Sequence, residues 1–173
     1  MTMLDIALEA DAEWDSRDWL DLAHRAATSA IAESAFPQLG HGARSVELGV
    51  RLTSDAEVRA LNATWRGKDK ATNVLSFPMA EPDELDDHQA GPELMLGDII
   101  LAHDVCATEA ADKAISIEAH ACHLMVHGTL HLLGYDHGDD DTAADMEARE
   151  VRALARIGIA DPYRPPPAVE DER

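Results

Sequence analysis

Histidines crowd one short segment of this 173-residue chain. Five of the nine lie within 18 residues, at His120, His123, His127, His131 and His137. On a helix, His127 and His131 are one turn apart, so both imidazoles project from the same face. Gly134 can adopt the backbone conformation that ends the helix and turns the chain back, which brings His137 to the same point. The segment therefore predicts a helix and a tight turn that meet at three imidazoles.

Three histidines at these offsets predict a divalent metal site. Three neutral imidazoles leave Zn²⁺ its full charge and an open fourth position for water or an anionic oxygen. We expect one zinc ion per chain, held by His127, His131 and His137, although imidazole also suits nickel, copper and iron. Two alternatives stay open: hydrogen-bonded core histidines without a metal, and a closed structural site, which normally has four protein ligands and prefers cysteine.

The segment HGTLHLLGYDH, residues 127–137, has the spacing of the metzincin peptidase motif H-E-x-x-H-x-x-G-x-x-H at every position but one. Gly128 stands where the peptidase glutamate, which is the general base, would be. Peptide hydrolysis by that route is therefore not expected, and a metalloprotease-like hydrolase is kept only as an alternative. Zinc-bound water has a pKa of roughly 7, so hydroxide would be available to attack a phosphodiester without a carboxylate base.

Several residues around this motif have two interpretations each. His120 and His123 fall on the same helical face as His127, where they either hydrogen-bond near the site or serve as half-buried packing residues. Asp136 is either a partner that orients an imidazole or part of an Asx turn. Asp98 interrupts an apolar strand, either as a buried hydrogen-bonding group or as a site contact.

Hydrophobic patterning predicts an α+β domain. Four strands are predicted from alternating apolar residues, at 4–8, 46–52, 73–78 and 93–102. Five helices are predicted from helical spacing, at 19–31, 54–65, 104–113, 116–133 and 140–157. Because the third and fourth strands resemble a hairpin, we expect one mixed sheet of about four strands, packed by about four to five helices.

Polar residues mark the helix starts and the limits of the domain. N-caps are expected at three places: Asp15-Ser16, a capping box of Ser54 and Glu57, and residues 140–142. The acidic segment 81–92 is expected to be a mobile loop. Residues 1–160 should form a single domain, and the charged, proline-rich tail, residues 161–173, should be flexible.

Composition excludes several classes of protein. Hydrophobic residues make up 46% of the chain, but none of its runs approaches the 20 or so apolar residues that span a bilayer. The first residues lack the basic and apolar regions of a secretory signal, so we expect a cytoplasmic protein. Cys106 and Cys122 form no disulfide framework, and we expect both to be reduced core thiols.

Charge is strongly negative and unevenly distributed. Fourteen Lys and Arg against 34 Asp and Glu give a formal net charge of −20, which argues against nonspecific binding to polyanions. Residues 71–112 hold ten acids and no Lys or Arg, whereas RGKDK at 66–70 holds three bases and one acid. Because charges beyond a Debye length of about 8 Å are mostly screened, this basic cluster can still hold an anion. A solvated loop is the alternative.

Three separated motifs resemble those of the YbeY family of bacterial rRNA maturation factors. In chain order they are LNATWRGKDKATNVLSFP at 61–78, LGDI at 96–99 and HGTLHLLGYDH at 127–137. The similarity runs from about Val46 to Pro162. It implies a single-strand-specific, metal-dependent endoribonuclease that acts in ribosomal RNA maturation, chiefly at the small-subunit 3′ end, and in ribosome quality control.

The resemblance also implies roles for individual residues. The three clustered histidines correspond to the metal ligands of the family, and Arg66 corresponds to a basic residue that contacts substrate. A guanidinium suits this role because it offers a bidentate fork to phosphate, whereas Lys68 and Lys70 act only as point charges.

The expected partners are single-stranded RNA, ribosomal RNA and ribosomal particles, with no membrane. Since a chain of net charge −20 repels RNA at long range, we expect ribosomal proteins or assembly factors to deliver the substrate. The main alternative is a non-catalytic ribosome-assembly factor whose metal is structural.

Overall fold

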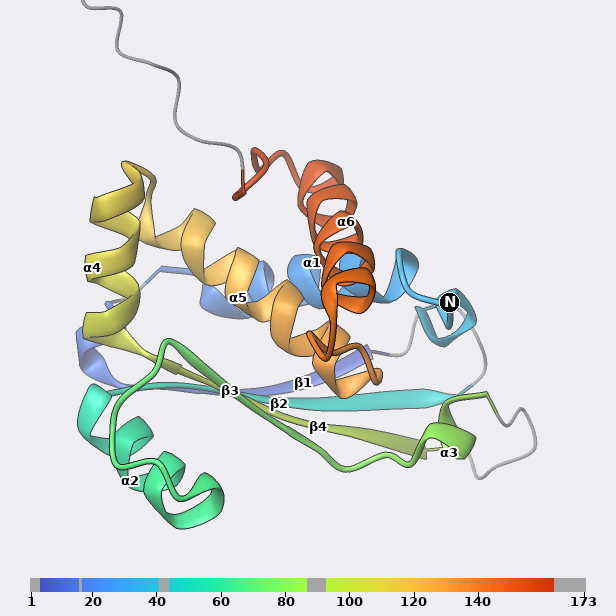
Figure 1. Ribbon diagram of the computed structural model, residues 1–173, viewed down its shortest axis with the longest axis horizontal. Coiled ribbons are helices and arrows are strands. Elements are labelled where there is room, and N and C mark those ends of the chain that lie inside the picture. Colours follow the sequence, from blue (N-terminus) through green and yellow to red (C-terminus); the bar gives the residue numbers. More distant parts are fainter. Residues whose placement is uncertain (1–3, 16, 41–43, 87–92, 164–173) are drawn as a thin grey trace, which may run out of the picture.

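A four-stranded mixed sheet forms the centre of the computed structural model, which describes residues 4–15, 17–40, 44–86 and 93–163 (Figure 1). The strands are β1 (Leu4–Ala10), β2 (Ser45–Thr53), β3 (Val74–Pro78) and β4 (Glu93–Ala102). Their order is β1-β2-β4-β3, with β3 antiparallel at one edge and the other three parallel. The α+β class and the single mixed sheet are confirmed.

Helices cover both faces of this sheet. The α-helices are α1 (Trp19–Ala32), α2 (Asp55–Arg66), α3 (Pro82–Asp86), α4 (His103–Lys113), α5 (Ile117–Leu132) and α6 (Asp140–Arg156). Two short 3₁₀ helices, η1 (Ala12–Trp14) and η2 (Pro37–Gly40), flank α1. Helices α1, α5 and α6 lie on one face and α2 lies on the other (Figure 1). In the part of the chain that the structure describes, none of these helices combines the length and the apolar character needed to cross a membrane.

One of the six α-helices, α3, was not predicted, and it forms within the segment that we expected to be a loop. Proline at its first position already has the helical φ angle, and Asp83 and Glu84 in the first turn favour the positive end of the helix dipole. Residues 87–92, the rest of that predicted loop, lie outside the described residues.

The core lies between the sheet and α1, α5 and α6. Alternate residues of β2, from Val46 to Leu52, are buried on this face, and Ile99 of β4 joins them. Helix α5 crosses the sheet very closely at Gly128, because a Cβ atom there would lie 3.0 Å from Cγ2 of Ile99. The two cysteines are buried and free, and burial raises the pKa of the Cys122 thiol to about 11.

The start of α1 differs from the prediction. Its N-cap is Asp18, whose carboxylate accepts a backbone N–H of the first turn. Asp15 belongs instead to the chain reversal after η1, and Ser16 lies outside the described residues. The helix begins late because η1 first buries Trp14, whose indole N–H donates to the Thr53 carbonyl at 2.9 Å.

The capping box predicted for Ser54 and Glu57 forms only in part. The Ser54 hydroxyl accepts the Glu57 N–H, but the Glu57 carboxylate binds Arg51 and Thr53 instead of returning to the N-cap. Hydrogen bonds from Arg51 and Thr53 lower the pKa of Glu57 to about 2. This carboxylate therefore connects the end of β2 to the start of α2.

The N-cap of α6 is Asp139, one residue before the predicted 140–142. Its carboxylate accepts the Thr142 N–H at 2.8 Å, and its own N–H donates to the Thr142 hydroxyl at 3.0 Å, which completes a capping box. Three consecutive aspartates offer the same capping chemistry, so the backbone conformation decides which of them serves.

Candidate active site

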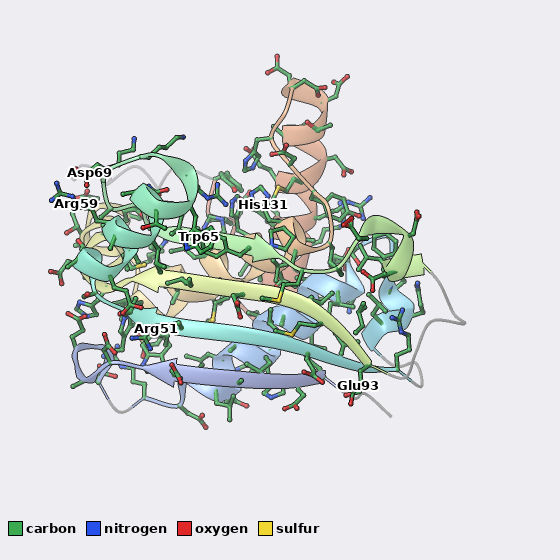
Figure 2. All side chains as sticks on the ribbon, turned by 90° about the horizontal axis from the view of Figure 1, so that it is seen from below. Arg51, Arg59, Trp65, Asp69, Glu93 and His131 are labelled. Atoms are coloured by element: carbon green, nitrogen blue, oxygen red, sulfur yellow. The ribbon has the colours of Figure 1, made fainter. Side chains whose placement is uncertain are left out.

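A cavity of about 390 Å³ opens where the C-terminal half of α5 meets the β3 edge of the sheet. Its lining includes Arg66 of α2, Ser76 of β3, His127 and His131 of α5, and Asp136 from the turn that follows. Figure 2 shows His131 on the β3 side of the sheet, away from β1. Segments distant in sequence therefore meet at this edge.

The three histidines predicted to be metal ligands lie together beside this cavity. One ligand atom from each of His127, His131 and His137 lies within 4.8 Å of the other two. The ring centroid of His127 is 4.6 Å from that of His131 and 5.0 Å from that of His137. His127 and His131 are half-buried, whereas His137 is exposed, so the group is partly open to solvent.

The turn after α5 brings His137 into this group. Gly134 has a φ of 101°, which a residue with a side chain rarely adopts. The Gly134 N–H donates to the His131 carbonyl and the Tyr135 N–H donates to the Leu130 carbonyl, which is the Schellman pattern of a helix end. Asp136 then accepts the His137 N–H at 2.7 Å, so its side chain shapes the turn.

A buried carboxylate, Glu150 of α6, holds His127 from behind. It accepts a hydrogen bond from His127 Nδ1 at 2.7 Å and from His123 Nε2 at 3.0 Å, and the Tyr163 hydroxyl donates to it. Burial alone would raise the pKa of Glu150, but the hydrogen bonds from His123 and His127 lower it to about 2. Because an ionised carboxylate can only accept, Nδ1 of His127 carries the proton of that hydrogen bond, and Nε2 is the nitrogen that has the lone pair in the neutral ring.

Sequence reasoning did not identify Glu150 or Tyr163. The available signal was a glutamate on the buried stripe of α6, four residues from Met146 on one side and from Leu154 on the other. Tyr163 belongs to the segment predicted to be a flexible tail, of which residues 164–173 lie outside the described residues.

His131 has the protonation state that metal binding requires. Burial, with further contributions from His127 and His137, lowers the pKa of the His131 imidazole to about 4. The ring is therefore neutral at pH 7 and retains a lone pair for a metal ion.

The structure separates two further candidate residues, His120 and Asp98, from the three histidines. His120 is buried and contacts Glu109 of α4 at 2.8 Å, and burial lowers its pKa. Asp98 pairs with Gly49 on the neighbouring strand and faces it so closely that a Cβ on Gly49 would lie 2.2 Å from Oδ1 of Asp98. Asp98 and Arg51 line a cavity that does not include the histidines.

Arg66 reaches the histidine cavity from the end of α2. Its Nη2 donates to the Ser76 carbonyl at 2.9 Å, and its guanidinium carbon lies 5.7 Å from the centroid of the Phe77 ring. Among the described residues that line this cavity, Arg66 is the one with a basic side chain. Lys68 and Lys70 are exposed and do not line the cavity.

Replacement of Gly128 by the peptidase glutamate would require the Ile99 side chain to move by a few tenths of an ångström. A Cβ at this position would lie 3.0–3.1 Å from three side-chain atoms of Ile99, so a side chain there would point into β4. The site therefore has no general base at the position where the peptidase motif supplies one.

Nearly the whole chain is similar to a set of proteins named as endoribonucleases. The family model described as endoribonuclease YbeY matches residues 8–158. The chain belongs to the YbeY endoribonuclease family. The YbeY endoribonuclease of Sphingopyxis alaskensis is 52% identical over 164 residues, which cover 93% of this chain and 98% of the relative. That of Novosphingobium aromaticivorans is 50% identical over 170 residues, covering 96% and 97%.

A solved structure agrees on the fold of this YbeY family member. The solution structure of the Thermotoga maritima protein TM1509 aligns with a TM-score of 0.52 and 22% identity, covering 90% of this chain and 91% of that one. The family expected from the three motifs is thus confirmed. The YbeY relatives are named as endoribonucleases, and the similarity covers nearly their whole length.

The hydrogen bond from His127 to Glu150 predicts an effect on metal binding. We expect Glu150→Gln to weaken zinc binding about tenfold to a hundredfold, because the amide no longer fixes the His127 ring as an ionised carboxylate does. Competition with a chromogenic chelator measures this affinity. Glu147→Gln, which removes the same charge from the same helix, is the control, and equal affinities for the two variants would contradict the role of Glu150.

Proposed function

We propose that this protein is a zinc-dependent endoribonuclease that cleaves single-stranded RNA in ribosomal RNA maturation, chiefly at the small-subunit 3′ end, and in ribosome quality control. The observation that carries the proposal is that two imidazoles and one guanidinium line one cavity, with a third imidazole grouped with the other two. Membership of an endoribonuclease family supports the same class of reaction. We propose a cytoplasmic protein, because the proposed substrate is ribosomal RNA.

The donor set fits one zinc ion per chain. His127, His131 and His137 offer nitrogen atoms within 4.8 Å of one another, and among the described residues this group has three members. A catalytic zinc typically has three protein ligands, whereas a structural one has four. When bound, zinc would supply an activated water or polarise a phosphoryl oxygen. Other divalent ions that accept imidazole fit the same donors.

The residues of the chain provide binding and orientation. In the part of the chain that the structure describes, Arg66 donates one of its five N–H groups, to the Ser76 carbonyl, which leaves the others for a phosphate. A guanidinium held in this way stabilises negative charge that develops on the phosphoryl oxygens. Glu150 maintains the tautomer and the ring orientation of His127.

Replacement of Arg66 tests this division of roles. We expect Arg66→Ala to lower cleavage of a labelled single-stranded RNA by about a hundredfold or more while zinc remains near one ion per chain. Arg59→Ala is the matched control, because Arg59 lies on the same helix but is paired with Asp69 (Figure 2). Cleavage assays and metal analysis by mass spectrometry measure both quantities.

Three outcomes would contradict the proposal in different ways. Loss of zinc from the Arg66→Ala variant would show that Arg66 maintains the metal site. Equal cleavage by the Arg66→Ala and Arg59→Ala variants would remove Arg66 from the reaction. A zinc-loaded wild-type protein that leaves RNA intact would favour a ribosome-assembly factor with a structural metal.

Charge predicts how the substrate is reached. A protein of net charge −20 repels free RNA, so we propose that ribosomal proteins or assembly factors present the RNA within ribosomal particles. We expect faster cleavage of RNA in such particles than of the same RNA alone, with the difference greatest at low salt, where repulsion is least screened. Equal rates at low salt would contradict delivery by a partner.

A further inference from the structure

The outer edge of β3 forms one wall of the cavity, and its main chain faces that cavity. In the sheet of the described residues, β4 is the one neighbour of β3. The Asn73 carbonyl accepts a main-chain N–H of β4, and the Met79 N–H donates to a main-chain carbonyl of β4. The main-chain N–H and carbonyl groups of the odd-numbered residues in this segment therefore face β4. The even-numbered residues Val74, Ser76 and Pro78 therefore face away from β4, and all three line the cavity.

A contact of Arg66 also indicates that the main chain of Ser76 points toward the cavity. Its Nη2 donates to the Ser76 carbonyl at 2.9 Å from the cavity side. Within the described part of the chain, no hydrogen bond engages the carbonyl of Val74 or the N–H of Ser76 on that side. The edge thus presents one acceptor and one donor next to the arginine that we assign to the phosphate.

This acceptor and donor have the chemistry of a base-reading pair. The carbonyl of one residue and the N–H of the second residue after it lie next to each other along a strand edge, ready to pair with a partner. An unpaired base likewise has an adjacent donor and acceptor on its Watson–Crick edge, and proteins that recognise single-stranded RNA bind that edge.

We infer that the Val74 carbonyl and the Ser76 N–H bind the Watson–Crick edge of one unpaired nucleotide beside the phosphate held by Arg66. The inference rests on the proposed function and adds a source of single-strand selectivity. A base in a duplex has already used its Watson–Crick edge, so the β3 edge accepts an unpaired base only. The cavity, at about 390 Å³, has the size of a pocket for one small ligand.

The same edge is poorly suited to a peptide strand. A peptide that extended the sheet would need successive N–H and carbonyl groups along β3. The Ser76 carbonyl is occupied by Arg66, and Pro78 has no N–H, so the pairing would be interrupted at two consecutive positions. A base needs only the Val74 carbonyl and the Ser76 N–H, which are both still available.

Chemically modified RNA tests the inference on the unaltered protein. The probe is a short fluorescent oligoadenylate in which each position in turn carries N6,N6-dimethyladenosine, which removes the Watson–Crick donor and keeps the charge. We expect modification at one position to weaken binding by zinc-loaded wild-type protein about tenfold, because the Val74 carbonyl then loses its hydrogen-bond donor. Equal affinity for every modified oligonucleotide would overturn the inference.

A pair of variants at one residue tests the main-chain donor. Ser76→Pro removes the N–H, and edge strands tolerate proline where the N–H faces outward. Ser76→Ala removes only the hydroxyl. We expect the proline variant to bind unmodified RNA about tenfold more weakly and to lose its discrimination against the modified base, while the alanine variant keeps both. Equal losses in the two variants would assign the contact to the hydroxyl and overturn the inference.

Thermal unfolding shows whether the proline variant folds, and if it does not, the modified oligonucleotides decide the question on wild-type protein. Binding is measured separately from cleavage, so the two proposals fail separately. Discrimination at one position without cleavage of RNA would support base binding by the β3 edge and contradict the proposed nuclease activity. Cleavage of RNA together with equal affinity for all the modified oligonucleotides would contradict only base binding by the β3 edge. An extended peptide that displaces the RNA from the edge would also overturn the inference.

Discussion

The close packing of α5 on β4 determines where every group of the candidate site can lie. At Gly128 the helix backbone approaches the sheet so closely that even a methyl group would meet Ile99 at 3.0 Å. With that residue turned to the sheet, His127 and His131 on either side of it reach the cavity at the β3 edge. The same contact means that a side chain at position 128 would press on Ile99, so the packing that forms the site favours glycine where the peptidase motif has glutamate.

A second constraint is the buried charge of Glu150. Removing a carboxylate from water is costly unless donors replace the lost hydration. His123, His127 and Tyr163 provide these donors from α5 and from the chain after α6. Their hydrogen bonds make the ionised form the stable one, and this form in turn fixes His127. Packing, protonation and ligand orientation therefore depend on one another, and Arg66 lines the same cavity from the end of α2.

Local features of this fold could be predicted and the contacts between distant segments could not. The burial of Val46, Leu48 and Val50 follows from period-two patterning, β4 follows from a short apolar run, and Gly134 marks the turn that gathers the histidines. Glu150 lies 23 residues from His127, and their contact depends on how α6 docks across α5. The open edge of β3 likewise depends on strand order, which periodicity does not contain.

X-ray absorption spectroscopy of the zinc-loaded protein tests the central claim most directly, because it reports the number and type of atoms around the ion. One open site made by three imidazoles predicts one zinc per chain with three imidazole nitrogens at about 2.0–2.1 Å and one further light atom that comes from solvent. Exchange of that fourth atom for an added anion would follow. A sulfur ligand at about 2.3 Å, four protein ligands or the absence of stoichiometric zinc would contradict the account.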